Sequence, residues 1–186
     1  MVALESMVMV PARELAPMSI DAWAEACGRS LEAGARLVTL YGRTDGDEVV
    51  VTAVLQSPGT GLVARRARAG RGARYSSLTA RFPAAQMAER ELWEQTGLLP
   101  EGHPWLKPVR FEGLRQQQMH EYPFFTMRGQ EMHEVGVGPI HASVIEPGHF
   151  RFMCHGERVA HLEIQLGYPH RGVESLLLQR PALALS

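Results

Sequence analysis

The chain has 186 residues, of which 45% are hydrophobic and 21% are charged, a composition typical of a folded protein and not of a disordered one. Its net charge of -1 argues against bulk nucleic acid as a partner. The two cysteines, Cys27 and Cys154, are too few for a disulfide framework or a Cys-based zinc site, and they favour a reducing compartment.

The N-terminus lacks the basic region and the sustained apolar core of a signal peptide. No segment reaches the roughly 18 apolar residues that are needed to cross a bilayer. We therefore expect a cytoplasmic chain, which can still bind a membrane complex from the side.

The first predicted element is a helix that begins after Ser19, a favourable N-cap residue, and ends before Gly34. Three strands are predicted at residues 35–41, 48–56 and 62–68, with a fourth candidate at residues 74–79. A second helix begins at Pro83 and ends at Gly97. A helix, a meander of strands and another helix predict a two-layer α+β domain.

A basic run extends from residue 49 to residue 88, where six arginines occur without an acidic residue. One interpretation is a docking face for an acidic partner or RNA. The other is a solvated strand edge, where charge discourages strand addition. No aromatic residues alternate with the arginines as a stacking platform, which favours the solvated edge. The arginines are Arg65, Arg66, Arg68, Arg71, Arg74 and Arg81.

The second helix carries two glutamates, Glu89 and Glu91, which are two positions apart and therefore lie on different helix faces. This spacing argues against a cooperating acid–base pair. The sequences FPAA at residues 82–85, ERELWEQTG at residues 89–97 and EGHP at residues 101–104 resemble the C subunit of NADH:quinone oxidoreductase (complex I). The family's usual Asp is replaced by Glu94.

The resemblance to the C subunit implies a scaffold with no redox centre of its own, which docks on the D subunit. It also implies a set of interface residues, namely Glu89, Arg90, Glu91, Trp93 and His103. Residues 111–131 show no clear periodicity, so we expect a domain at residues 1–110, a linker at residues 111–131 and a further segment at residues 132–186.

The last segment is predicted to contain strands at residues 135–137, 143–145, 149–155 and 158–166, followed by the start of a helix. The two longer strands form a hairpin with one apolar side, which must pack on something. Several histidines occur here, but no HExxH or CxxC spacing gathers them, which argues against a metal site. The apolar side of the last strand is expected to be buried through Ala160, Leu162, Ile164 and Leu166.

The same segment resembles the start of the large subunit of membrane-bound, energy-converting NiFe-hydrogenases, including formate hydrogenlyase. More distantly, it is similar to the D subunit of complex I. The resemblance is carried by VGPIH at residues 137–141, IEPGHFR at residues 145–151, Gly156-Glu157 and GYPHRGVE at residues 167–174. Together with the C-subunit resemblance it covers about residues 75–186, and it favours the hydrogenase branch over the quinone branch.

This second resemblance implies that the loop at residues 141–149 borders the active-site cavity, with His141 in the loop and Glu146 as a proton relay. It places His170 and Arg171 near an iron–sulfur cluster held by a partner subunit. The residues alone leave other roles open: Glu146 suits a turn before a proline, and Arg171 suits capping of local carbonyls.

In the family, two CxxC pairs hold the NiFe centre, and this sequence contains neither pair. We therefore expect a chain truncated before those cysteines that binds no cofactor by itself. The expected role is a peripheral-arm oxidoreductase subunit at the inner membrane. Its partners would be an iron–sulfur small subunit, membrane subunits and a separate chain with the rest of the large subunit. The alternatives are a non-catalytic assembly or scaffold protein, and a plain α+β domain with a disordered tail.

Overall fold

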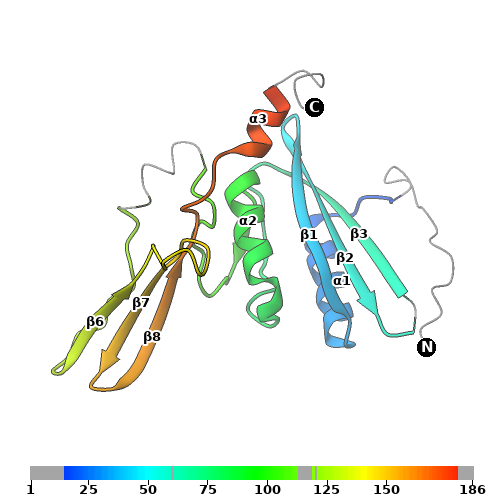
Figure 1. Cartoon of the computed structure of the whole chain (residues 1–186). Helices are drawn as coiled ribbons and strands as arrows, with labels where there is room; N and C mark the ends of the chain where they lie inside the picture. Colours follow the sequence, from blue (N-terminus) through cyan, green and yellow to red (C-terminus); the bar gives the residue numbers. More distant parts are fainter. Residues whose placement is uncertain (1–14, 60, 113–118, 120, 180–186) are drawn as a thin grey trace. The chain divides into compact units, whose positions relative to one another are not determined.

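The computed structural model describes residues 15–59, 61–112, 119 and 121–179. The chain divides into two compact units, Met1–Lys107 and Pro108–Ser186 (Figure 1). The first unit holds two α-helices, a three-stranded sheet and a two-stranded sheet, and the second holds a three-stranded sheet and one helix. This confirms the predicted mixed α+β class. No helix in the described part of the chain is long and apolar enough to cross a membrane.

Helix α1 (Ile20–Glu32) begins as its sequence predicts. The Ser19 hydroxyl accepts a hydrogen bond from the Ala22 amide at 3.3 Å, which satisfies one of the free N–H groups of the first turn. Ala33 is the C-cap residue, and Gly34 follows with φ 87°, a left-handed conformation that glycine adopts without strain.

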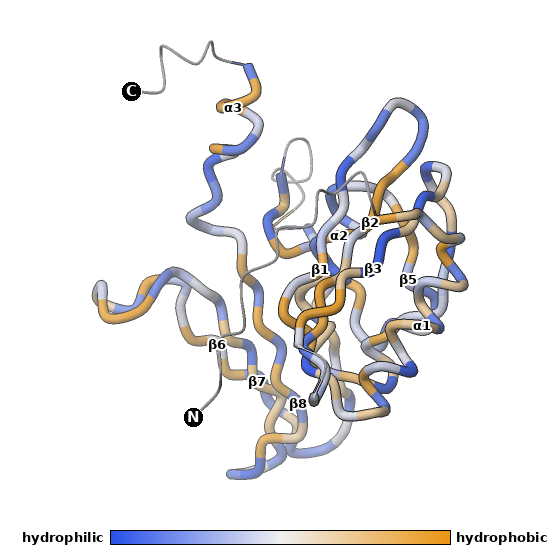
Figure 2. The backbone as a smooth tube through the Cα atoms, turned by 90° about the vertical axis from the view of Figure 1, so that its right-hand side faces the viewer, coloured by the Kyte–Doolittle hydropathy of each residue, from blue (hydrophilic) through white to orange (hydrophobic). Residues whose placement is uncertain are grey.

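Strands β1 (Arg36–Asp45), β2 (Glu48–Ser57) and β3 (Gly61–Gly70) form an antiparallel sheet in that order. The prediction that the first strand ends at residue 41 was wrong. Residues 42–45 contain Gly and Asp and suit a turn, but they pair with residues 48–51 of β2, and Gly46 makes the turn with φ 64°. The hydrophobic sequence of β2 gives this central strand the side chains of a buried strand (Figure 2).

The helices α1 and α2 (Gln86–Thr96) share one hydrophobic core with the sheet. A 3-10 turn, η2 (Pro83–Ala85), leads into α2, and Gly97 ends it with φ 80°. Met87 is 41% exposed, whereas Glu89, Arg90, Leu92 and Thr96 are the buried residues of α2. The core includes Trp23, Cys27, Leu40, Val49, Val51, Leu55, Tyr75, Leu92 and Leu98.

Strand β4 (Arg74–Ser76) is shorter than the candidate at residues 74–79, and it pairs in parallel with β5 (Leu99–Glu101). Strand β5 was not predicted, because three residues with Pro100 in the middle give no periodic signal. The pairing brings the segment before α2 beside the segment after it, which places both within reach of α2 side chains.

In the second unit, β6 (Met132–Val137), β7 (His149–His155) and β8 (Arg158–Gln165) form an antiparallel sheet, and α3 (Val173–Gln179) follows. The strand predicted at residues 143–145 was wrong. The chain turns there, and Ala142 and Ser143 have φ values of 50° and 61°, which are incompatible with a strand.

The β6–β7–β8 sheet buries its polar face and exposes its apolar face, whereas the sequence predicted a buried apolar face. Hydrophobic and hydrophilic residues alternate along its strands (Figure 2). Leu162, on the apolar face with Val135 and Phe152, is 41% exposed, and Ala160 is exposed, whereas Glu163 and Gln165 on the polar face are each 2% exposed. The predicted buried face was therefore wrong.

The covering residues are Met119 and residues 121–125 of the same unit. The Phe125 amide donates to Glu163 Oε2 at 2.8 Å, and Gln165 Nε2 donates to the Met119 carbonyl at 3.2 Å. The Phe125 ring lies 4.4 Å from the His161 ring, centre to centre. These contacts satisfy buried polar groups of β8, so the polar face can be the inner one.

Candidate functional site

The Glu89 carboxylate is fully buried and accepts four hydrogen bonds from residues 77–79. Ser77 Oγ and Thr79 Oγ1 donate at 2.7 and 2.6 Å, and the Leu78 and Thr79 amides donate at 2.9 Å each. These donors offset the cost of removing a charge from water. Burial, together with the Glu89 charge, raises the pKa of Tyr75 well above its ordinary value.

Arg90, the next residue, is 1% exposed and serves a different segment. Its Nε donates to the Lys107 carbonyl at 2.6 Å, and its guanidinium carbon lies 4.6 Å from the centre of the Trp105 ring. The Trp105 amide donates to His103 Nδ1 at 3.0 Å. Burial lowers the pKa of His103, so this ring stays neutral at neutral pH. Arg90 and His103 thus fix residues 103–107.

The five residues that were predicted as an interface therefore lie in two environments. Glu89 and Arg90 are buried and bond to nearby segments of the chain itself. Glu91, Trp93 and His103 are half-buried, and Glu91 Oε1 accepts from Gln95 at 3.3 Å. Their role in an interface stays a prediction. Sequence reasoning missed Ser77, Thr79 and Trp105; two hydroxyl residues shortly before an acidic helix were the available signal.

In the second unit, two histidines close the loop between β6 and β7. His141 Nε2 donates to the Gly148 carbonyl at 2.7 Å, and its ring packs edge-on against Phe150 with the ring centres 5.5 Å apart. His149 Nδ1 lies 3.4 Å from the Gly138 carbonyl oxygen. The loop ends are thus held together by imidazole-to-backbone contacts.

Glu146 lies on the loop that His141 organises, and its side chain is exposed in the structure. Two apolar neighbours on the same loop are also exposed, Ile140 at 85% and Val144 at 82%. The loop therefore brings Glu146 and His141 into one segment, and the relay role of Glu146 stays a prediction.

His170 and Arg171 precede α3 and meet different surroundings. His170 Nε2 lies 3.6 Å from Glu112 Oε2, whereas Arg171 is exposed. Arg110 forms an ion pair with Glu174 at 2.5 Å, and the Ser175 hydroxyl donates to Glu112. The start of α3 is thus tied to residues 110–112.

No three His, Cys, Asp or Glu side chains of the described residues are placed to share a metal ion. Cys27 and Cys154 are both buried, and they belong to different units. Burial raises the pKa of Cys27 to about 12, which keeps it a neutral thiol. The residues present do not fit a NiFe group that is held by two CxxC pairs.

Comparison with known families shows which family the chain belongs to. The family model described as "Respiratory-chain NADH dehydrogenase, 30 Kd subunit" matches residues 17–124, which is more than half of the chain. The chain belongs to this family. The Glu89 and Arg90 clusters lie within the matched residues of this 30 kDa-family chain, whereas β6, β7 and β8 lie beyond residue 124.

Three curated relatives are similar to parts of this NADH dehydrogenase 30 kDa-family chain. Hydrogenase-4 component G of Escherichia coli (strain K12) is 33% identical over 122 residues, which cover 55% of this chain and 22% of the relative. Formate hydrogenlyase subunit 5 of the same organism is 34% identical over 123 residues, with the same two coverages. Carbon monoxide-induced hydrogenase of Rhodospirillum rubrum is 41% identical over 46 residues, 25% of this chain and 13% of the relative. The chain thus spans about a fifth of the length of the first two relatives.

Proposed function

We propose that the chain is a peripheral-arm subunit, or part of one, in a membrane-bound NiFe-hydrogenase or complex I-like oxidoreductase. The first unit serves as a docking scaffold on an iron–sulfur small subunit and the membrane subunits. The second unit contributes part of the wall of the active-site cavity. The observation that carries the proposal is the family match over residues 17–124, joined to relatives that are named as hydrogenase or formate hydrogenlyase components.

The exposed apolar side of the β6–β7–β8 sheet supports this assignment. Large contiguous apolar surfaces on soluble proteins mark interaction sites. Here Phe125 and Met119 already bond to the polar face, which leaves the apolar face for another domain. We assign that face to the body of a hydrogenase-type large subunit. The exposed apolar residues of the sheet and its loop include Val135, Val137, Ile140, Val144, Ile145 and Leu162.

In the proposed complex, Glu146 acts as a proton relay. A carboxylate that a partner encloses in a dry cavity has a raised pKa and exchanges protons near neutral pH. His141 positions the loop through its bond to Gly148. Arg171 and His170 lie near an iron–sulfur cluster of the small subunit, where a cation raises the reduction potential of the cluster.

Co-purification tests the subunit assignment. The chain, tagged in its native host and extracted in mild detergent, is expected to migrate with a hydrogenase-type small subunit and its membrane subunits, as identified by mass spectrometry. Migration of the chain alone, at the size of a 20.6 kDa protein, would contradict the proposal.

Substitution of Glu146 tests the relay. Glu146→Gln keeps the shape of the side chain but removes the titrating group, so turnover of the assembled complex is expected to fall while the subunit composition is unchanged. Glu157→Gln is the matched control, because Glu157 is an exposed glutamate in the β7–β8 turn. Equal turnover of the Glu146→Gln complex and the unsubstituted complex would remove Glu146 from the relay.

The second candidate function is a non-catalytic assembly or scaffold protein, which the misfit of Cys27 and Cys154 to a NiFe group favours. Such a protein would be found with precursors of the complex and would be absent from the mature, active form. The same co-purification, carried out separately on precursor and mature fractions, distinguishes the two functions.

A further inference from the structure

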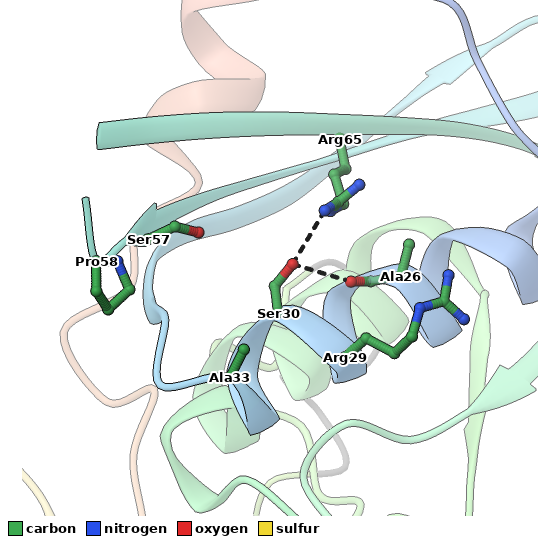
Figure 3. Close-up of a pocket in the computed structure, with 7 residues that line it drawn as sticks. All are labelled: Ala26, Arg29, Ser30, Ala33, Ser57, Pro58 and Arg65. Carbon is green, nitrogen blue, oxygen red and sulfur yellow. Dashed lines mark hydrogen bonds between the residues drawn. The ribbon is translucent and has the colours of Figure 1, made fainter. Parts of the chain in front are cut away.

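A pocket of about 300 Å³ lies in the first unit, between the second half of α1, the end of β2 and strand β3 (Figure 3). Its charged lining residues are both arginines, and no acidic side chain of the described residues lines it. The lining residues are Ala26, Arg29, Ser30, Ala33, Ser57, Pro58 and Arg65.

The Arg65 side chain is held in place from β3 toward α1. Its Nη2 donates to Ser30 Oγ at 3.0 Å, and the Ser30 hydroxyl donates in turn to the Ala26 carbonyl at 3.1 Å (Figure 3). Arg65 is half-buried, and its Nε is buried without a hydrogen-bond partner. The guanidinium is therefore pre-positioned, which reduces the entropy lost when a ligand binds.

Three other arginines of the first unit have a carboxylate partner, and Arg65 differs from them in this respect. Arg29 pairs with Glu25 at 2.7 Å, Arg68 with Glu48 at 2.8 Å and Arg74 with Glu101 at 2.9 Å. Those three arginines are substantially exposed, whereas the half-buried Arg65 has no carboxylate partner among the described residues. A partly desolvated cation without a counter-charge is costly, so an anion from outside the unit is favoured there.

The walls of the pocket indicate which anion. Ala26, Ala33 and Pro58 offer apolar surface beside the cation, and Ser57 adds a hydroxyl. A guanidinium matches the two oxygens of a carboxylate, and a short alkyl stem suits the apolar walls better than a free phosphate does. We propose that this pocket binds a carboxylate carried on a short apolar stem, either a small free acid or an acidic side chain of another polypeptide.

Titration of the full chain with propionate, followed by ¹H–¹⁵N NMR, tests the pocket. Propionate is expected to shift the amides of Ser30, Ala33 and Ser57 saturably, and inorganic phosphate at equal ionic strength is expected to shift them much less. The Arg65→Gln variant should raise the propionate concentration at half-saturation roughly tenfold, because the guanidinium that would bind both carboxylate oxygens is lost. Arg65→Lys keeps the positive charge but lacks the parallel N–H donors of a guanidinium, so it should raise the half-saturation concentration by less. Arg68→Gln is the matched control on the same strand and should leave the midpoint within about twofold.

A second titration distinguishes the two possible sources of the carboxylate, a small free acid and an acidic side chain of another polypeptide. N-acetylglutamate methylamide, which carries the carboxylate on a peptide-like backbone, binds like propionate if the ligand is an acidic side chain. It fails to bind, while propionate binds, if the ligand is a free acid. Absence of saturable shifts up to roughly 100 mM propionate would overturn the proposal and leave Arg65 as a cation that stabilises the C-terminal end of α1. Phosphate binding as tight as propionate binding would overturn the carboxylate assignment. If Arg65→Gln does not fold, the titrations of the unsubstituted chain and of Arg65→Lys still decide whether the pocket binds a carboxylate.

Discussion

Glu89 and Arg90 are adjacent in sequence and both buried, yet they fix different segments of the first unit. Glu89 holds residues 77–79, which precede α2, and Arg90 holds residues 105–107, which follow β5. Two adjacent charged residues of one helix thus connect it to segments on either side of it in the sequence. This arrangement explains how a helix with a mostly polar sequence can be a structural centre of the unit.

Removal of the Glu89 carboxylate is expected to destabilise the first unit strongly. In Glu89→Ala, the donors of Ser77, Leu78 and Thr79 lose their acceptor inside the protein, which costs about 3 kcal/mol of unfolding free energy. Urea unfolding followed by tryptophan fluorescence measures this loss, because the three tryptophans lie in the first unit.

The control for this substitution is Glu25→Gln. Glu25 is largely exposed and pairs with the exposed Arg29, so the unfolding free energy should hardly change. Equal losses in the two variants would show that the bonds to residues 77–79 are not what stabilises the unit.

His103 is expected to make the first unit less stable in mild acid. Burial lowers its pKa in the folded chain below the ordinary value of about 6.5, so the unfolded chain takes up the proton at higher pH than the folded chain does. Stability from this group is fully present above about pH 6.5 and is lost as the pH falls below that value.

The variant His103→Asn removes the titrating group, and its side-chain oxygen can still accept from the Trp105 amide. The urea midpoint should therefore fall less between about pH 7 and about pH 5.5 in the variant than in the unsubstituted chain. Identical slopes would rule out His103 as the source of the pH dependence.

At the scale of residues, the sequence motif at residues 89–97 pointed to the right helix but not to the burial of its charges. Burial of Glu89 depends on donors that reach α2 through the β4–β5 pairing, and that pairing joins segments more than 20 residues apart. The resemblance to the C subunit implied Glu89 and Arg90 as interface residues, and it gave no sign that both charges are buried, which is rare for charged residues.

At the scale of elements, the loop at residues 138–149 depends on close packing at Gly138. This residue has φ 92°, and a Cβ there would lie 2.3 Å from the Gly148 carbonyl oxygen and 2.5 Å from His141 Nε2. The backbone of one loop end thus sits against the other, where only glycine fits.

We expect Gly138→Ala to open this loop. The added methyl group must displace Gly148 and the His141 ring, so the amides at the ends of β6 and β7 should exchange with solvent roughly tenfold faster or more. Hydrogen exchange followed by mass spectrometry measures the change. Gly156→Ala is the control, since Gly156 also has a positive φ of 56° but has no atom within 4 Å of the added carbon. Similar exchange in both variants would assign the effect to backbone strain and not to packing at Gly138.

The elements themselves were largely predictable from local signals. The Ser19 cap and Gly34 located both ends of α1, and Gly97 located the C-terminal end of α2, whereas the start predicted at Pro83 proved to be the 3-10 turn before α2. Alternation located β7 and β8. Alternation shows that a strand has two faces but does not show which face is covered. That choice was made by Met119 and Phe125, which lie in a stretch without periodicity and bond to residues of β8 that follow them by 46 and 38 positions.

At the scale of the whole molecule, several apolar residues of the β6–β7–β8 sheet and its loop are 41% to 85% exposed, and exposed apolar patches favour association. The isolated chain is therefore expected to self-associate through the apolar face of its β6–β7–β8 sheet. Leu162→Ser should lower the fraction of oligomer in sedimentation velocity at a given concentration, because Leu162 lies on that face.

Leu62→Ser provides the matched control for self-association. Leu62 lies on β3 of the first unit and is 69% exposed, more than Leu162 at 41%. An equal effect of the two substitutions would mean that general surface hydrophobicity drives association, and the apolar face would have no special part in it.

The segment at residues 119–125 also constrains the order of events during synthesis. The residues of the first unit have all been made once Lys107 has left the ribosome. Phe125 and Met119 must wait for Glu163 and Gln165, which are made 38 and 46 residues later. Closure over such separations is slow compared with helix or hairpin formation. The nascent chain therefore carries a finished first unit followed by uncovered aromatic residues, and that interval is when a chaperone or a partner subunit has the best access to it.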